Sequence, residues 1–295
     1  MVFLDFWYSV FLPLALLATW LAPRTARPYA LLFFCLIFHW HYAGPAGMKP
    51  ILLLAAAVYL ALRTGKLAIG VGGVCVAAWL FYRQPAIQGA LGVGSLIVAP
   101  LAISFFTFEF LHLLIDRAQG RLKKLPSARD YLLFLLFFPS LAAGPIKRYQ
   151  QFQPQLGTLG WPGSEVAARA LSRVAYGFFM KLVLSSWFLS QLPRNLAQDP
   201  FESSLVLGMF TYGHVALDLT AYSHIAIGSA MLLGITLPEN VRPVIVARSF
   251  SDYWSRWHMT VTQWFRDYVL WPVAGSGGEP WRFYLGIGLA LFFSA

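Results

Sequence analysis

Long apolar stretches separated by short polar segments run along most of this chain. The stretch from Phe3 to Ala22 is long enough to cross a bilayer as a helix, and so is the stretch from Leu96 to Ile115. Shorter apolar runs lie between them, each broken by glycine, proline or arginine: residues 29–42, 51–62 and 67–82. We therefore expect an all-α, polytopic transmembrane protein that also contains re-entrant and interfacial helices.

The composition agrees with a membrane protein. Hydrophobic residues make up 58% of the chain and charged residues only 12%, which is too few to cover a water-soluble surface of this size. The net charge of +10 does not indicate nucleic acid, because the basic residues lie between apolar runs and form no patch. We expect the lipid bilayer, and no nucleic acid, as a partner.

The sequence gives no sign of a metal centre or a disulfide framework. Cys35 and Cys75, the two cysteines, both lie inside apolar runs. The six histidines include no HxxxH or HxxHH pair, which membrane di-iron oxygenases need to hold two metals. We expect no metal ligands and no bound cofactor.

Basic residues are distributed unevenly between alternate loops. Segments 23–28, 63–66 and 116–130 carry nine lysines and arginines, whereas 43–50 and 83–95 carry two, Lys49 and Arg83. Cytoplasmic loops of membrane proteins are enriched in these residues. The first set is therefore expected in the cytoplasm and the N-terminus outside, in a multi-pass protein of the bacterial cytoplasmic (inner) membrane.

The apolar run from Tyr131 to Ala143 is too short to cross about 30 Å of hydrocarbon. Gly144 and Pro145 then break the run, and two cations, Lys147 and Arg148, follow. We interpret the segment as re-entrant, turning back at Gly144 and Pro145. A simple turn at these two residues is the alternative.

The stretch from Ser249 to Pro272 combines aromatic and ionisable residues. As one helix, capped by Ser251 or Asp252 and ended by Pro272, it would place an aromatic stripe on one face: Trp254, Trp257, His258, Val261, Phe265 and Tyr268. It is too polar to cross a bilayer unaided. We expect it at the membrane interface or lining a polar cavity, with His258 pointing away from bulk water.

Ionisable residues also lie within other apolar segments. Lys181 is in the middle of the helix expected over 166–189, and we expect its ammonium group to reach the membrane interface, with a catalytic role as the alternative. His214 and Asp218 are four residues apart on one helical face and can hydrogen-bond to each other. They are interpreted as a mutually satisfied pair, a pocket wall or a proton relay.

Several of these motifs resemble the membrane-bound O-acyltransferase (MBOAT) family, in its alginate O-acetylase and D-alanyl-transfer branch. The resemblance rests on Trp254-x-x-Trp257-His258 and on the Trp-Phe-Arg-Asp-Tyr run that ends at Tyr268. The Phe-Phe-Pro of 137–139, the Ala-Gly-Pro-Ile of 143–146, Asp218 and the Leu-Pro-Glu-Asn of 237–240 extend it to roughly residues 100–275. Residues 219–221 and 272–275 depart from the pattern of the branch.

The resemblance implies transfer of an acyl group, with acetyl favoured, from a thioester to a hydroxyl of an extracytoplasmic polysaccharide or cell-wall polymer. The donor would be acyl-CoA or an acyl carrier protein, and other subunits of an export or modification complex are conceivable partners. His258 is the candidate catalytic residue, since neutral imidazole can take a hydroxyl proton; a structural hydrogen-bonding role is the alternative. The candidate substrate- or pocket-lining residues are Asp218, His214, Asn240, Trp254, Trp257, Arg266 and Asp267.

The basic loop from Arg117 to Arg129 could attract an acidic carrier or a CoA phosphate, although positive-inside topology explains the same charges. Two function classes other than an enzyme remain open. One is a transporter or flippase with a polar path through His214, Asp218 and His258. The other is a non-catalytic scaffold of a polymer-modification complex.

Members of this branch carry a second histidine in an apolar helix a few tens of residues beyond the first, and that second histidine is usually taken as the catalytic base. In this sequence the last apolar run begins near Trp281 and continues for about fifteen residues to Ala295. We expect either a fragment without its C-terminal helices or a catalytically inactive relative. The expected layout is one membrane domain over 1–295: N-terminal helices to 100, an MBOAT-like core over 101–275, and an incomplete helix over 276–295.

Overall fold

The computed structural model describes residues 3, 5–65, 67–90, 100–141, 144–191, 200–275 and 279–294, and every regular element in these ranges is helical, as expected. The elements are α1 (Phe6–Leu21), α2 (Arg27–Thr64), α3 (Ala68–Arg83), α4 (Pro85–Ala90), α5 (Ile103–Ala118), α6 (Ala128–Leu136), α7 (Phe138–Leu141), α8 (Tyr149–Phe152), η1 (Gln153–Thr158), α9 (Ser164–Phe179), η2 (Met180–Ser185), α10 (Ser186–Ser190), α11 (Pro200–Leu232), η3 (Val244–Val246), α12 (Phe250–Trp254), α13 (Met259–Phe265), η4 (Arg266–Leu270), α14 (Trp271–Ala274) and α15 (Pro280–Ser294).

Aromatic side chains fill the centre of the molecule. Phe11 and Phe38, from α1 and α2, both pack against Phe138 of α7, with ring centroids 5.1 and 5.4 Å apart. These three rings are almost inaccessible to solvent. The core therefore joins the N-terminal helices to the short broken segment that precedes Gly144.

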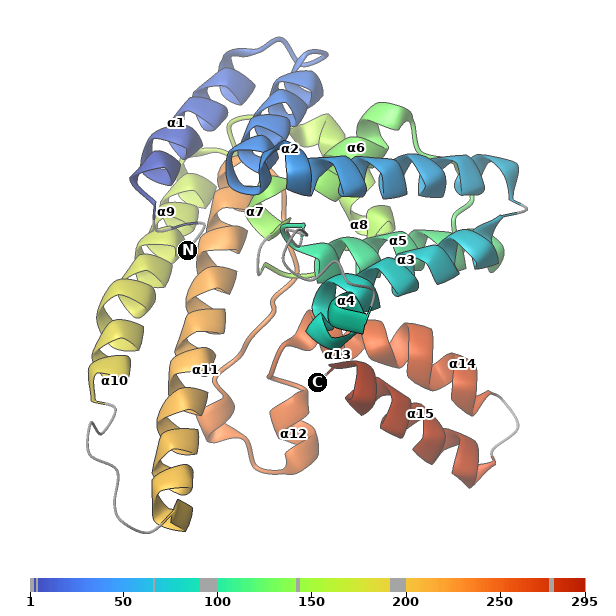
Figure 1. Cartoon of the computed structure of the whole chain (residues 1–295). Helices are drawn as coiled ribbons and strands as arrows, with labels where there is room; N and C mark the ends of the chain where they lie inside the picture. Colours follow the sequence, from blue (N-terminus) through green and yellow to red (C-terminus); the bar gives the residue numbers. More distant parts are fainter. Residues whose placement is uncertain are drawn as a thin grey trace.

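Helices α9 and α11 run side by side over much of their length (Figure 1). Gly177 and Gly228 allow this close approach, because a Cβ atom at either position would lie 2.8 Å from a backbone oxygen of the other helix. Small residues at helix interfaces are typical of packing in membranes, where van der Waals contact replaces the hydrophobic effect. The segment that continues α9, η2, also lies against α11, and its polar residues contact those of α11.

Among the described residues, two helices are long and apolar enough to cross a membrane: α2 and residues 204–232 of α11. The expected span from Phe3 begins later, at Phe6 with Asp5 as its cap, and its 16 residues reach about 24 Å. The apolar runs 29–42 and 51–62 are joined in α2, which has a kink at Gly44 (φ 60°). The number of spans and the re-entrant topology stay predictions.

The stretch from Ser249 to Pro272 is not the continuous helix that we expected. His258 has left-handed backbone angles (φ 43°, ψ 49°), which separate α12 from α13. Ser249, and not Ser251 or Asp252, caps α12 by accepting from the Asp252 N–H. Pro272 does not end the helix: it lies inside the continuous helical run of α13, η4 and α14, and this run ends at Ala274 with Gly275 as its cap.

The break also divides the expected aromatic stripe into two groups. Trp257 lies against Tyr253 and Tyr212, with ring centroids 6.3 and 5.9 Å away. Phe265 instead packs on Phe108 of α5, with centroids 5.6 Å apart, and the neighbouring Trp264 donates its indole N–H to the Phe108 carbonyl. The first group faces α11, and the second fastens α13 to α5.

Gly144 begins a buried, non-helical segment that continues to Arg148. A Cβ atom at Gly144 would lie 2.6 Å from Ser140 Cα and 3.1 Å from Ala226 Cβ. We expect Gly144→Ala to destabilise the fold by about 1–3 kcal/mol, because backbone would have to move. Gly157→Ala is the matched control, since a Cβ there meets nothing within 4 Å. Equal midpoints of the two variants in thermal unfolding in detergent would contradict the expectation.

Candidate active site

Asn240 connects three parts of the chain around His258. Its buried side-chain oxygen Oδ1 lies 2.7 Å from Thr260 Oγ1, 3.4 Å from Thr260 N and 3.2 Å from His258 Nδ1. Its Nδ2 donates to Ser223 Oγ of α11 (3.2 Å), and its backbone carbonyl accepts from Met259 N–H (2.7 Å). The start of α13 is therefore held against α11 by a single residue of the intervening loop.

His258 occupies a strained position within this group. A left-handed conformation costs a residue other than glycine about 1–2 kcal/mol and persists only where surrounding contacts impose it. The ring is largely buried, and this burial lowers the pKa of His258 to about 4. At neutral pH the imidazole is therefore uncharged. The described part of the chain provides Nε2 with no hydrogen-bond partner.

Aromatic residues border His258 on its N-terminal side. Trp257 precedes it, and the hydroxyl groups of Tyr253 and Tyr212 hydrogen-bond to each other at 2.7 Å, joining α12 to α11. Trp254 lies edge-on to Tyr253, with ring centroids 5.5 Å apart. Of the residues predicted to line the site, Asn240 contacts His258 and Trp257 directly precedes it, whereas Trp254 is connected to this group through Tyr253.

Lys181, Ser185, His214 and Asp218 form a second polar cluster, between η2 and α11. The expectation that the Lys181 ammonium group reaches the interface is wrong, because Lys181 is buried and forms an ion pair with Asp218. His214 and Asp218 do not bond to each other directly. Ser185 Oγ lies between them, donating to Asp218 Oδ1 (2.8 Å) and lying 3.0 Å from His214 Nδ1.

The backbone around Lys181 explains this geometry. Residues Met180–Ser185 form a π-helical segment, a local widening that is often found at functional sites. It follows the closely packed α9, so the Lys181 side chain meets α11 and not lipid. The lysine also lies 5.4 Å from the centre of the Tyr222 ring.

A third polar cluster lies on one face of α5 and was missed in the sequence. Buried Glu109, His112 and Asp116 contact residues that follow Gly144: Glu109 pairs with Lys147, and His112 Nε2 accepts from Tyr149 N–H (3.3 Å). Asp116 accepts from Tyr268 OH at 3.0 Å. Spacings of three and four residues, with ionisable groups inside an apolar run, were the available signal.

Arg266 and Asp267 belong to the third cluster and not to the surroundings of His258. Asp267 accepts from Arg148 (3.2 Å) and from Arg266 (3.0 Å), and Arg148 lies over the Tyr268 ring, 4.5 Å from its centre. The residues predicted to line one pocket are thus divided among three clusters. Helix α11 carries members of two of them, Asp218 and Ser223.

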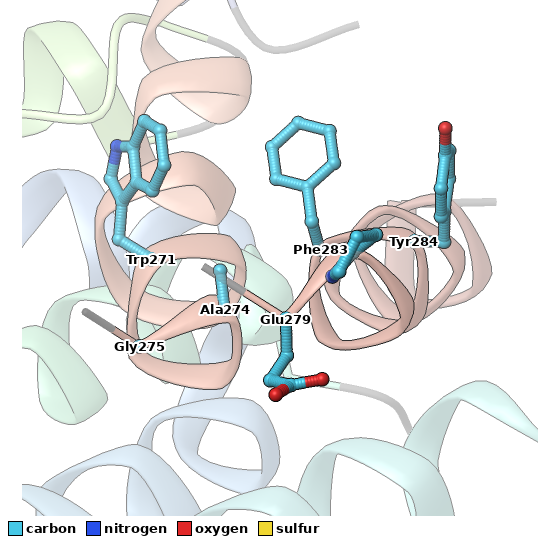
Figure 2. Close-up of a pocket in the computed structure, with 7 residues that line it drawn as sticks. Trp271, Ala274, Gly275, Glu279, Phe283 and Tyr284 are labelled. Carbon is cyan, nitrogen blue, oxygen red and sulfur yellow. The ribbon is translucent and has the colours of Figure 1, made fainter. Parts of the chain in front are cut away.

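A cavity of about 330 Å³ lies apart from these clusters, beside α14 and α15 (Figure 2). In this view the Trp271 and Phe283 rings lie on one side, and the Glu279 carboxylate extends the other way. Its lining includes none of the predicted site residues. The described side chains also contain no group of three or more histidines, cysteines and carboxylates arranged to hold a metal ion.

Residues 98–295 match the family model described as MBOAT, membrane-bound O-acyltransferase family. The chain belongs to this family, as the motifs around His258 and Asn240 suggested.

Its relatives come from the expected branch. The chain is 30% identical over 185 residues to a teichoic acid D-alanyltransferase of Bacillus subtilis, an alignment covering 59% of this chain and 45% of the relative. It is 28% identical over 201 residues to a probable alginate O-acetylase AlgI of Pseudomonas aeruginosa (66% and 38%), and 26% identical over 214 residues to a peptidoglycan O-acetyltransferase of Helicobacter pylori (61% and 40%). The alignments cover less than half the length of these curated relatives.

Proposed function

We propose that this chain carries out O-acyl transfer in the bacterial cytoplasmic membrane. An acyl group, acetyl in the first instance, moves from a thioester to a hydroxyl of an extracytoplasmic polysaccharide or cell-wall polymer. Membership of the MBOAT family supports the reaction class, and the names of the relatives support a polymer acceptor. The observation that carries the proposal is an uncharged histidine, His258, whose Nδ1 faces the Asn240 oxygen while Nε2 has no hydrogen-bond partner among the described residues.

In the proposed reaction His258 is the general base. The acceptor hydroxyl attacks the thioester carbonyl as Nε2 takes its proton, so that a C–O bond forms. The C–S bond then breaks, and the imidazolium returns the proton to the departing thiolate. A hydroxyl is a poor nucleophile until its proton is removed, and positioned bases of this kind contribute about 10²–10⁴-fold to rate. The aromatic residues 253, 254 and 257 shield the thioester from water.

The proposed orientation follows the charge distribution. Several spans, with the N-terminus outside, place the basic loop from Arg117 to Arg129 in the cytoplasm. A CoA or carrier-protein thioester approaches from that side, and the polymer from the other. The core over 101–275 holds the reaction site, with Asp218 and His214 lining the α11 side.

The proposal is tested by His258→Asn, because asparagine tolerates the left-handed backbone better than most residues. The full chain in liposomes is given a radiolabelled acyl thioester and a cell-wall polymer, and label on the polymer is counted. We expect a loss of at least about a hundredfold. His41→Asn is the matched control, since His41 stacks on Trp7 of α1 and belongs to none of the three polar clusters.

Two other results would contradict the proposal. Acylation that is unchanged in His258→Asn would leave His258 without a catalytic role. Accumulation of polymer inside the liposomes, with no acyl label in any sample, would favour the transporter reading.

Because the pKa of His258 is about 4, the active neutral form predominates above that value, and wild-type activity should fall through this residue only below about pH 5.

A further inference from the structure

The backbone N–H of Thr260 determines which way the Asn240 side-chain amide is oriented. A backbone N–H can only donate, so the Asn240 atom facing Thr260 N–H must be the oxygen. The Thr260 hydroxyl agrees with this assignment. It accepts from Ile146 N–H (3.0 Å), and its own proton is directed to Asn240 Oδ1 at 2.7 Å.

The other end of the amide fits the same orientation. Asn240 Nδ2 donates to Ser223 Oγ, and the Ser223 hydroxyl in turn donates to the Leu219 carbonyl at 2.8 Å. If the amide were turned over, Nδ2 and Thr260 N–H would be two donors facing each other, with no acceptor between them. Such an arrangement is unfavourable because Asn240 is buried, and a buried polar group without a partner lowers the stability of the fold by about 1–3 kcal/mol.

The protonation pattern of His258 follows from this orientation. Asn240 Oδ1 can only accept, so His258 Nδ1, at 3.2 Å, must carry the proton of the neutral ring. The lone pair of the imidazole is then on Nε2. We propose that Asn240 is a positioning residue, which holds His258 in the Nδ1–H tautomer and so makes Nε2 the basic atom of the site. The use of Nε2 as a base rests on the function proposed above.

Asn240 also supports the strained backbone at His258. The first N–H groups of a helix need acceptors, and His258 provides no side-chain cap for α13. Asn240 supplies acceptors for the first two of these N–H groups. Its backbone oxygen accepts from Met259 N–H (2.7 Å), and its side-chain oxygen accepts from Thr260 N–H. One residue therefore directs the imidazole and caps the helix that begins after it.

The tautomer can be measured without any assay of acyl transfer. Full-length protein labelled with ¹⁵N-histidine is studied by NMR in lipid, and the His258 signals are identified by their loss in His258→Asn. We expect a protonated nitrogen at Nδ1 and an unprotonated nitrogen at Nε2. A neutral ring protonated at Nε2 would overturn the proposal, even if His258→Asn abolishes activity.

Two substitutions at position 240 separate positioning from a merely structural role. In Asn240→Ala the imidazole of His258 should no longer prefer one tautomer, and a mixture of Nδ1–H and Nε2–H forms is expected. Asn240→Asp should retain Nδ1–H, because the carboxylate is still an acceptor, and should raise the pKa of His258. Retention of pure Nδ1–H in Asn240→Ala would overturn the role of Asn240. Ser223→Ala, which alters only the far end of the amide, is the matched control and should keep the wild-type tautomer.

Kinetic measurements on variants at position 240 test the positioning role of Asn240 separately from the proposed function. Asn240→Ala should lower kcat by at least about tenfold with little change in KM, and Asn240→Asp should recover part of the loss. If Asn240→Ala does not fold, the wild-type and Asn240→Asp spectra still decide the tautomer. Nδ1–H in a protein that transfers no acyl group would leave the positioning inference intact and reject the acyltransferase.

Discussion

Replacing Lys147 by methionine is expected to destabilise the fold by about 3–5 kcal/mol, because it leaves Glu109 as an unpaired carboxylate inside the protein. Both partners of this ion pair are buried, with 2% and 6% of their side-chain surfaces exposed. The Lys147 ammonium group also lies 4.7 Å from the centre of the Phe134 ring, where it gains cation–π attraction. The pair joins α5 to the segment that follows Gly144.

The measurement is the free energy of unfolding in mixed micelles, compared with the matched variant Lys123→Met. Lys123 is exposed, so its replacement should change stability by no more than about 0.5 kcal/mol. In the double variant Lys147→Met/Glu109→Leu most of the stability should return, since apolar residues of similar size often replace a buried ion pair without loss. If Lys147→Met and Lys123→Met unfold with similar free energies, the buried ion pair between Lys147 and Glu109 is contradicted.

The second large effect is expected at Lys181, in the π-helical segment. We expect Lys181→Met to destabilise the fold by about 3 kcal/mol, at the lower end of the range for broken buried ion pairs. The loss is smaller than at Lys147 because Asp218 keeps the hydrogen bond from Ser185 and is 20% exposed. Were Lys181 to reach the membrane interface instead, methionine would be tolerated with little change.

A double-mutant cycle with Asp218→Leu isolates this interaction. Coupling between the two substitutions should be favourable, with the double variant more stable than the sum of the single losses. Leu182→Ala is the matched control for the helix itself, because this neighbouring side chain is 56% exposed. Additive losses at Lys181 and Asp218 would contradict the ion pair.

The residue pattern predicted helices, but it did not predict which distant side chains those helices contact. The run over 67–82 is the helix α3, because apolar length alone decides such an element. Lys181 was assigned to the interface because helical spacing reports only neighbours three or four residues away. Its partner Asp218 is 37 residues further on, and that contact depends on the close packing of α9 with α11.

The break at His258 shows the same limit at the site. Nothing in the local sequence requires a left-handed residue between Trp257 and Met259. Residues other than glycine adopt this conformation in only a few per cent of cases, although histidine does so more often than most. The conformation exists because Asn240, 18 residues earlier, accepts from both N–H groups that follow. An expectation of one continuous helix was therefore reasonable locally and wrong in the folded chain.

The sequence by itself determined that this chain is a helical membrane protein of the O-acyltransferase family, and it singled out His258 and Asn240. These conclusions rest on apolar runs and short motifs, which are local properties. Tertiary structure alone decided the division of the candidate residues into three clusters, the pairing of Glu109 with Lys147, and the atom of His258 that faces Asn240. The physical reason is that a buried polar group must find its partner across the packed core, and helical periodicity carries no information about which distant residue that is.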